Sequence, residues 1–403
     1  MNLLVLGARA PAALDLTRRL HRAGHHVVIA DSWAAAIGLQ SRACKQCAAI
    51  ASPRFQFDSF VDDLNRLVRR HHIERIIPTC EEIFYVAAAK EQGRIDCPVF
   101  ASSLDVLRRL HDKSALPAMI NAFVGKSSNQ RIRVPETMTL PEFIHRDLPL
   151  DEFVLKPSFS RFASETIVHP TSHDLQSIVD SEQEATWTVQ KRIQGTEFST
   201  YSLAIHGELA AHTCYESVLR AGLGAGIAFR TVRNNVLENF VSGFVKHANF
   251  HGQIGFDIIQ DEQRNTWVIE CNPRCTSGLH LFKKDGNLAN LFAKTFSSSD
   301  TAHNESSAGI ASEILRSPEN LWAHVEFASS FWGLVDAWNR RRWGALVRTL
   351  ISGRPVVTSM MDPGPTLMLP RTLWSLWSRS RTHRCSIQQA TTVDMQWDGQ
   401  AIS

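Results

Sequence analysis

Residues 2–112 alternate short apolar segments with amphipathic ones, and this alternation restricts the fold more than any other feature of the chain. The apolar segments read NLLVLGA, HHVVIAD, CAAIAS, ERIIPTC and CPVFA. Helical patterns lie between or after them at about 11–23, in a second stretch after HHVVIAD, at 58–71, from Glu81 and at 103–110. Strands that alternate with helices form βαβ units around a parallel sheet. The sequence therefore predicts a parallel α/β domain over residues 1–112.

A different pattern follows, in which strands dominate. EFVLKPS and TWTVQKRI flank a helical pattern near 172–180, and EFSTYSLAIHGELAAHTCYESV alternates with period two around His206-Gly207, a hairpin-turn signal. After a predicted helix at about 235–249, GQIGFDIIQ and TWVIECN are expected to pair across the turn DEQRN. Antiparallel sheets should therefore follow the parallel domain, and a length of 403 residues favours two or three domains.

The last two of these strands carry oxygen-donor side chains near their ends. On an alternating strand Asp257 points away from its apolar neighbours, and Glu270 and Asn272 lie two residues apart on one face. If the strands pair in antiparallel fashion, the three side chains converge, and they are the hard ligands that Mg²⁺ takes. Arg274, just beyond, could bind a phosphate or carboxylate in bidentate fashion.

Two lysines upstream strengthen this hypothesis. Lys156 ends the strand EFVLK, and Lys113 opens a helix in HDKSAL. A single strand-end lysine is more often a solvated charge, whereas two lysines together with an acidic metal set favour a nucleotide polyphosphate. The loop SFSRFAS after Lys156 is rich in serine, and its backbone N–H groups and hydroxyls, those of Ser158 and Ser160 among them, could cover phosphates as a mobile lid.

This order of parts resembles the ATP-grasp superfamily, in particular the carbamoyl-phosphate-synthase-like branch of carboxylate–amine ligases. The resemblance spans roughly residues 1–285 and rests on RIIPTCEE, the lysine of DK, VLKPSFSR, VQKRIQGTEFS, GQIGFDIIQ and IECNPRCTSGLH in this order. It implies an α/β protein of the α+β ATP-grasp type, with an N-terminal parallel α/β domain, a two-lobed ATP-grasp module with antiparallel sheets and a mainly helical C-terminal extension. The expected parts are an N-terminal domain (1–112), a lid subdomain with hinge (113–192), a catalytic subdomain with the metal site (193–300) and a Trp/Arg-rich extension (301–403).

The resemblance also implies a role for each matching residue. Contacts to the α- and β-phosphates of ATP are implied for Lys113 and Lys156. Contacts from the hinge to adenine are implied for Gln190, Lys191 and Ile193, and contacts to the ribose hydroxyls for Glu197. One or two Mg²⁺ ions, with Mn²⁺ as an alternative, are implied at Asp257, Glu270 and Asn272. Arg274 is expected to stabilise the transferring phosphoryl group or an acyl phosphate, with Lys156 as the second catalytic residue.

Two positions depart from the family pattern. Many members have Glu where this chain has Gln190, and the first metal ligand is often Glu where this chain has Asp257. Glutamine can both accept and donate a hydrogen bond, so the preference for adenine is less certain. Both changes conserve the chemistry of the site.

The implied activity is ATP-dependent ligation of a carboxylate to an amine through an acyl phosphate, on small molecules such as amino acids. One alternative is a carboxylase or an enzyme that forms carbamoyl phosphate, although the sequence contains one ATP-grasp unit and no visible biotin-carrier or glutaminase segment. Another is a nucleotide-binding scaffold that docks a membrane or a partner. A scaffold has no need for a complete metal set, which argues against the last alternative.

Residues that contact the two substrates are harder to predict. Arg230 or Arg233 could pair with a substrate carboxylate, and a surface role for either arginine is about as good an interpretation. His280 in the segment SGLH lies where the family places substrate contacts.

The C-terminal extension has a composition of its own. Seven of the ten tryptophans lie at or beyond Trp322, mixed with arginine in WNRRRWGALVRTL and LPRTLWSLWSRSRTHR. Helices of this kind could make peripheral contact with an anionic membrane surface, or they could pack on the rest of the protein with arginines at the edge. The sequence leaves both readings open.

Hydropathy, net charge and cysteine content bear on the location and the partners of the protein. No apolar run approaches the eighteen or so residues of a membrane span, and the N-terminus is read as a strand and not as a signal peptide, so a cytoplasmic protein is expected. A net charge of +3 is too small to argue for nucleic-acid binding, and a homodimer stays open. Eight scattered cysteines indicate reduced thiols; Cys44 and Cys47 in CKQC have the spacing of metal ligands, and a zinc or redox role is weighed there against an ordinary connection.

Overall fold

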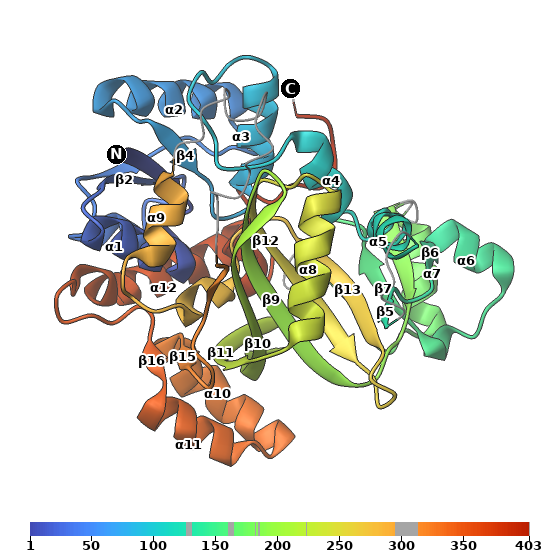
Figure 1. Cartoon of the computed structure of the whole chain (residues 1–403). Coiled ribbons are helices and arrows are strands. Elements are labelled where there is room, and N and C mark those ends of the chain that lie inside the picture. The colour runs from blue at the N-terminus through green and yellow to red at the C-terminus, as the bar shows by residue number, and fades with distance from the viewer. Residues whose placement is uncertain are drawn as a thin grey trace.

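The computed structural model describes residues 1–125, 131–159, 165–181, 183, 186–222, 224–294 and 313–402. Three sheets divide the molecule: a parallel sheet at the N-terminus, a large mixed sheet in the centre and a small antiparallel sheet at one side (Figure 1). This arrangement confirms the predicted α/β fold class. The Ser-rich stretch 296–310 lies outside the described residues.

The N-terminal sheet has the strand order β3-β2-β1-β4, and all its pairs are parallel. Its strands are β1 (Asn2–Leu6), β2 (His26–Asp31), β3 (Gln46–Ala49) and β4 (Arg75–Ile77). Its helices are α1 (Pro11–Arg22), α2 (Phe57–His71), α3 (Glu82–Glu91) and α4 (Leu104–His111), with a 3₁₀ turn η1 (Ile37–Gln40). The helices predicted at about 11–23, 58–71, from Glu81 and at 103–110 lie within one or two residues of these limits. The helical stretch predicted after β2 is only the turn η1, and the predicted strand CPVFA forms only an isolated bridge from Val99 to Ile76. The apolar period is strong in α1, α2 and α4, whereas α3 is buried on every side from Glu82 to Ala89.

The central sheet runs β16-β15-β11-β10-β9-β12-β13-β5, and β14 pairs with β10 beside this path. Its long strands are β9 (Thr196–Ile205), β10 (Glu208–Ala221), β11 (Ala225–Val232), β12 (Gly252–Gln260) and β13 (Thr266–Asn272), and its short ones are β5 (Ile132–Arg133), β14 (Leu315–Arg316), β15 (Trp322–His324) and β16 (Arg354–Pro355). The hairpin between β9 and β10 turns at His206 and Gly207, whose φ angles of 47° and 83° are both positive, as a tight hairpin turn requires.

The two faces of the central sheet are covered differently. Helix α8 (Asn235–His247) packs on one face, where the rings of Phe240 and Phe244 lie 5.2 and 5.4 Å from that of Phe256. The 3₁₀ segment η4 (Ser277–Leu281) covers part of the other face, so closely that a Cβ on Gly278 would collide with the side chain of Tyr201. Helix α9 (Asn287–Ala293) follows η4. Residues of the N-terminal domain join both apolar clusters of this sheet, so the two domains share their cores.

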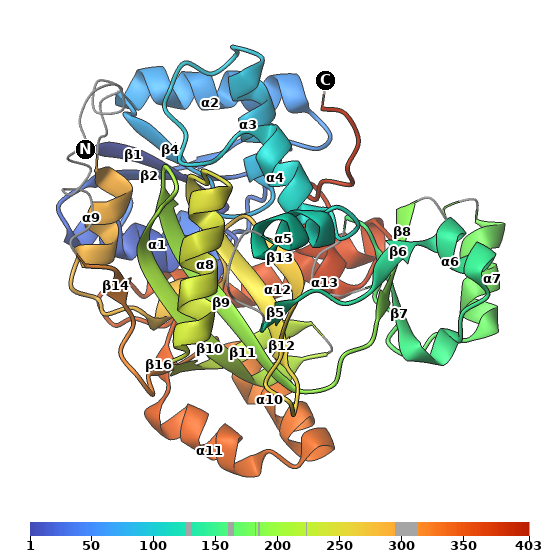
Figure 2. The same ribbon diagram turned by 45° about the vertical axis from the view of Figure 1, so that its right-hand side comes forward.

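The small sheet has the order β6-β8-β7 and stands to one side of the central sheet (Figure 2). It consists of β6 (Thr137–Thr139), β7 (Phe153–Pro157) and β8 (Trp187–Lys191), with helices α6 (Leu140–Arg146) and α7 (Ser172–Asp180) and a 3₁₀ turn η2 (Leu150–Glu152) nearby. Helix α5 (Leu116–Val124), which precedes this sheet in the chain, packs instead on α4, β5 and α8. Its buried residues form an apolar cluster of their own around Phe143, Leu155 and Val189. A separate core allows this subdomain to move as a unit.

The C-terminal part is joined to the central sheet, whereas the sequence indicates a mainly helical extension. Its helices are α10 (Glu326–Arg340), α11 (Trp343–Ser352), α12 (Gly364–Thr382) and α13 (Ile387–Ala390). However, β14, β15 and β16 also extend the central sheet, with Trp322 of β15 paired to Arg230 of β11. Short strands such as these give too little period-two signal to be recognised from sequence. Among the described helices, none combines the length and apolarity needed to cross a bilayer.

The cysteines follow the prediction with one correction. Cys44 and Cys47 form a disulfide, whereas reduced thiols were expected throughout and an ordinary connection was preferred for this pair. The other six cysteines are not disulfide-bonded, and all but Cys385 are buried. The three-residue separation in CKQC is too short to predict this pairing without the backbone turn that precedes β3.

Candidate active site

A β-bulge between β12 and β13 creates the acidic cluster. From Gln260–Thr266 to Ile258–Val268 the two strands pair in regular antiparallel register, but Asp257 then pairs with Glu270, so Ile269 is an extra residue. Directly opposed residues share a face of the sheet, which brings the carboxylates of Asp257 and Glu270 together. In an unbroken ladder Asp257 would oppose Ile269, and Glu270 would point to the opposite face.

The bulge also brings Asn272 to the cluster. Asn272 pairs with Gly255, so it lies on the same face as Asp257, and its Nδ2 donates a hydrogen bond to Asp257 Oδ2 at 3.0 Å. Ser199 of the neighbouring strand β9 donates from Oγ to Asp257 Oδ1 at 2.7 Å. Arg274 is buried and donates to Asn272 Oδ1 at 2.9 Å, with its Nε 3.8 Å from Glu81 of the N-terminal domain.

The side chains of the acidic cluster can supply part of the ligand shell of a magnesium ion, with phosphate oxygens supplying the rest. Burial and the charge of Glu270 raise the pKa of Asp257, while the hydrogen bond from Ser199 lowers it. Within the described residues no group of three His, Cys, Asp or Glu side chains gathers to hold a metal, and this site offers two carboxylates and one amide. Mg²⁺ is characteristically bound by one or two carboxylates together with substrate phosphates and water. The residues therefore fit a magnesium ion that arrives with a polyphosphate.

Lys156 and Lys113 lie within electrostatic reach of the carboxylates. Both lysines are buried, and Lys156 Nζ donates to Gln190 Oε1 at 2.8 Å. Burial lowers the pKa of Lys156 to about 8; the charges of Glu270 and Asp257 oppose this change, and the charge of Lys113 adds to it. Two cations and two carboxylates thus influence one another across a single space, as expected of a site for a charged ligand.

The loop after Lys156 begins with Ser158, which is held in place from two sides. Its Oγ lies 2.7 Å from Thr188 Oγ1 on β8, and its carbonyl oxygen accepts a hydrogen bond from the backbone N–H of Lys113 at 3.2 Å. This contact joins the two lysine-bearing segments. Ser160, the other predicted phosphate contact, lies outside the described residues.

The predicted hinge connects the small sheet to the central one. Gln190 is buried at the end of β8, whereas Lys191 is exposed and lies 3.4 Å from Glu152; Ile193 follows between β8 and β9. Glu197, at the start of β9, forms an ion pair with Arg220 of β10. Of these residues, Gln190 contacts Lys156, whose Nζ donates to its Oε1.

The three predicted substrate residues have other surroundings. Arg230 lies on the opposite face of the central sheet from Asp257. The paired residues Asp257, Ser199, Tyr215 and Thr231 form one row across the sheet and share a face, and Arg230 is the residue next to Thr231 in β11. It binds Glu216 at 2.5 Å. Arg233 is exposed and pairs with Glu319 at 3.4 Å, and His280 is buried with its Nδ1 3.0 Å from Asp15 of α1. These contacts make none of the three a member of the acidic cluster.

A buried charge network, which the sequence did not reveal, joins the C-terminal segment to the N-terminal domain. Arg9 follows β1 in the turn GARAPAA, and its guanidinium binds Asp31 at the end of β2 and Asp394 near the C-terminus, with 2.5 Å from NH1 to Asp394 Oδ1. Arg379 of α12 also binds Asp394, at 2.7 Å. In a dinucleotide-binding fold this turn would hold a pyrophosphate, whereas here protein side chains occupy it.

The same C-terminal segment, residues 387–402, reaches the other walls of the site. The Trp397 ring stacks on Phe84 with centroids 4.8 Å apart and meets Phe159, in the loop after Lys156, edge-on at 5.1 Å. From α13, Gln389 Nε2 donates to Glu165 Oε1 at 2.7 Å, and Gln388 Nε2 donates to the carbonyl oxygen of Ala221 at 3.0 Å. The segment therefore contacts the N-terminal domain, the small subdomain and the end of β10.

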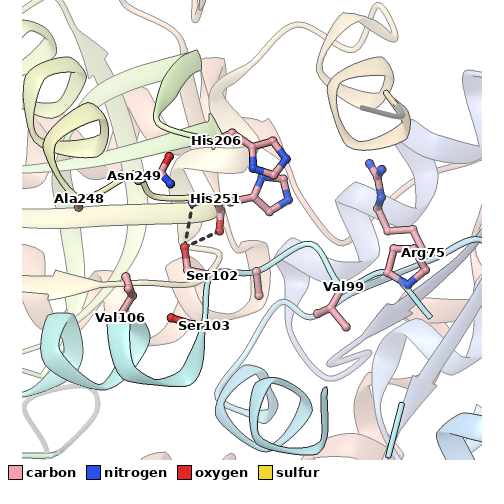
Figure 3. A pocket seen from close by; sticks show the side chains of 11 residues that line it. Arg75, Val99, Ser102, Ser103, Val106, His206, Ala248, Asn249 and His251 are labelled. Atoms are coloured by element: carbon pink, nitrogen blue, oxygen red, sulfur yellow. Dashed lines mark hydrogen bonds between the residues drawn. The ribbon is translucent and has the colours of Figure 1, made fainter. Parts of the chain in front are cut away.

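A cavity of about 530 Å³ lies apart from these residues, between α4 and the turn that joins β9 to β10 (Figure 3). The rings of His206 and His251 stack there with centroids 4.4 Å apart, and Ser102 Oγ accepts a hydrogen bond from the backbone N–H of His251 at 2.8 Å. Burial and, to a smaller extent, the charges of His206 and Arg75 together lower the pKa of His251 to about 4. None of the predicted site residues lines this cavity.

Comparison with known proteins defines the class. Residues 124–278 match a family described as ATP-grasp domain. The biotin carboxylase domain of 2-oxoglutarate carboxylase from Hydrogenobacter thermophilus, solved with MgADP, ADP and bicarbonate, aligns with a TM-score of 0.56 at 14% identity over 74% of this chain and 70% of that one. The match identifies residues 124–278 as an ATP-grasp domain, and the likeness to the solved structure is one of fold.

Two further solved structures show the breadth of chemistry on this fold. L-amino acid ligase from Bacillus licheniformis aligns with a TM-score of 0.52 at 14% identity, over 69% of this chain and 68% of that one. N5-carboxyaminoimidazole synthetase from Staphylococcus aureus aligns with a TM-score of 0.55 at 11% identity, over 73% and 78%. No curated protein matches by sequence. At these identities the structures establish the fold alone.

Proposed function

We propose that the protein is an ATP-dependent carboxylate–amine ligase that forms an amide bond between small molecules such as amino acids. The observation that carries this proposal is the grouping of Asp257, Glu270 and Asn272 with Arg274 and Lys156 around one space. In this proposal residues 113–192 form the lid and hinge, residues 193–300 the catalytic subdomain, and the site uses ATP with Mg²⁺ or Mn²⁺.

The proposed binding mode follows from the charges. Lys113 and Lys156 neutralise the α- and β-phosphates, and Ser158 holds the phosphate loop next to them. Gln190, Lys191 and Ile193 bind the adenine edge, and Glu197 binds the ribose. Asp257, Glu270 and Asn272 would hold the metal, which supplies charge neutralisation at the β- and γ-phosphates when bound.

The proposed chemistry has two steps. An oxygen of the substrate carboxylate attacks the γ-phosphorus in line, the bond to the β-phosphate oxygen breaks, and ADP leaves. The amine then attacks the acyl carbon, loses a proton and expels inorganic phosphate. Arg274 stabilises charge on the transferring group, and the small subdomain excludes water from the acyl phosphate.

A second candidate reaction is carboxylation or carbamoyl phosphate formation with bicarbonate as the acid. It is favoured by the biotin carboxylase and N5-carboxyaminoimidazole synthetase likenesses. A nucleotide-binding scaffold is a weaker candidate, because it would not require Arg274 to be held against the metal-ligand candidate Asn272.

The test is ADP release by the purified protein with Mg²⁺-ATP, screened over pairs of amino acids and simple amines and, separately, with bicarbonate. Release that requires both members of a pair, together with a condensed product in the mass spectrum, is the expected result. Release with bicarbonate alone would favour the carboxylase reaction. MgADP binding without turnover under any condition would favour the scaffold.

Lys156 gives this site a pH dependence. Its charged form binds phosphate, and its lowered pKa of about 8 means that the charge is lost as pH rises through that value. We expect MgADP affinity, measured by calorimetry, to fall above about pH 8. Lys156→Met should weaken binding at neutral pH roughly 10- to 100-fold, the value of a charge-assisted hydrogen bond, and should remove this fall. The exposed Lys246→Met is the matched control, and an unchanged pH profile in Lys156→Met would contradict the assignment.

A further inference from the structure

Helix α10 turns small residues towards the protein and exposes its large apolar side chains. It buries Ser329, Gly333 and Ala337 against the central sheet and exposes Phe327, Phe331, Leu334, Val335 and Trp338. The exposed residues recur at intervals of three and four, so they form one stripe along the helix. Small residues face the protein because the helix packs closely: a Cβ on Gly333 would lie 3.2 Å from a methyl group of Leu346. Trp338 is 73% exposed, and burying large apolar side chains is what ordinarily holds such a helix in place.

Helix α11 repeats this arrangement. It buries Leu346 and Thr349 and exposes Trp343, Val347, Leu350 and Ile351, which again form one stripe. The rings of Trp338 and Trp343 lie 6.1 Å apart, so the two stripes meet where α10 turns into α11. Both helices lie at the end of the molecule farthest from α2 (Figures 1 and 2). We call this surface, made by the nine exposed residues named here, the α10–α11 face.

The charge around the α10–α11 face is strongly positive. Residues 326–352, which form the two helices and the turn between them, contain four arginines, no lysine and two acidic residues. Both acids have partners inside the protein: Asp336 binds Arg340 at 3.2 Å, and Glu326 accepts from the backbone N–H groups of residues 357 and 358. The turn between the two helices, residues 340–342, is Arg-Arg-Arg and is exposed.

We propose that the α10–α11 face docks on an anionic lipid surface. Contiguous exposed apolar residues of this size mark an interaction site, and tryptophan beside arginine suits the boundary between acyl chains and negatively charged headgroups. The helices would lie in that boundary and not cross it, since neither is long enough to span. A second copy of the chain is the poorer occupant, because it would bring the same arginines towards the same surface.

The test is co-sedimentation of the full chain with vesicles of phosphatidylglycerol and phosphatidylcholine, and with vesicles of phosphatidylcholine alone. We expect binding to the anionic vesicles that weakens with salt. Phe331→Ser combined with Trp338→Ser should lower the affinity more than about tenfold, and Arg341→Gln about fivefold, the effect of one charge at the surface. Both changes lie on the exposed face, so the fold should be unaffected.

Phe55→Ser provides the matched control, because Phe55 is 56% exposed, close to the 61% of Phe331, but precedes α2 at the opposite end. Three results would overturn the proposal: no binding of the wild type to anionic vesicles, equal binding by the double variant, or equal binding to neutral vesicles. A dimer in analytical ultracentrifugation that Phe331→Ser dissociates, without vesicle binding, would assign the face to a second copy instead. The readout is binding, so it does not depend on the proposed ligase activity.

Discussion

Replacing Glu270 by alanine is expected to lower ATP turnover by about 10³-fold or more, with the fold intact. Glu270 supplies one of the two carboxylates at the proposed metal site, and removal of a group that stabilises charge in the transition state costs several kcal/mol of activation free energy. The measurement is ADP release under the conditions that give maximal turnover in the wild type. MgADP affinity should fall as well, because the metal holds the phosphates.

Glu262→Ala is the matched control for this variant. Glu262 lies in the exposed turn between β12 and β13, eight residues before Glu270, so its loss removes the same charge from the same hairpin without touching the cluster. Turnover in Glu262→Ala should equal that of the wild type. If Glu270→Ala kept full turnover while folding normally, the metal assignment at the bulge would be wrong.

Replacing Arg9 by alanine is expected to lower the free energy of unfolding by roughly 3–5 kcal/mol, the cost of breaking a buried ion pair. The Arg9 guanidinium lies between Asp31 and Asp394, and both carboxylates are buried. Burial alone would raise the pKa of Asp394, but hydrogen bonds and the charge of Arg9 hold it well below its usual range. Without Arg9 the carboxylate of Asp31 loses its ion-pair partner in the interior, whereas Asp394 keeps Arg379. Urea unfolding is the measurement.

The exposed ion pair of the same C-terminal segment is the control. Arg54 lies 3.0 Å from Asp398, and both side chains are about a third or more exposed, so Arg54→Ala should cost less than about 1 kcal/mol. Adding Asp31→Ala to Arg9→Ala should recover part of the loss, because it removes the carboxylate that Arg9→Ala strands. Equal stability of Arg9→Ala and Arg54→Ala would show that the C-terminal segment is not held by this network.

The helices and long strands were predictable because their apolar periods are local properties. Segments such as 57–71 and 252–260 have a pattern that only one secondary structure satisfies, and the predicted order of parallel and antiparallel regions is confirmed. The two-residue strands β14 and β16 escaped notice because they exist only through pairing with distant partners. Arg230, a predicted substrate contact, lies on the opposite face of the central sheet from Asp257. Its position in the sequence does not determine which face of the sheet it occupies.

The sequence by itself determined which side chains are available: two lysines, two carboxylates, an amide and an arginine, each in or next to a segment with strong strand or helix character. The tertiary structure decided which of them meet. A regular ladder from the turn at 261–265 would separate Asp257 from Glu270, and the single extra residue Ile269 reverses the face of every residue beyond it. Likewise, Arg9 and Asp394 lie 385 residues apart and meet only through the folded chain. Side-chain chemistry is a local property of the sequence, whereas register and long-range contact depend on the packing of the whole molecule.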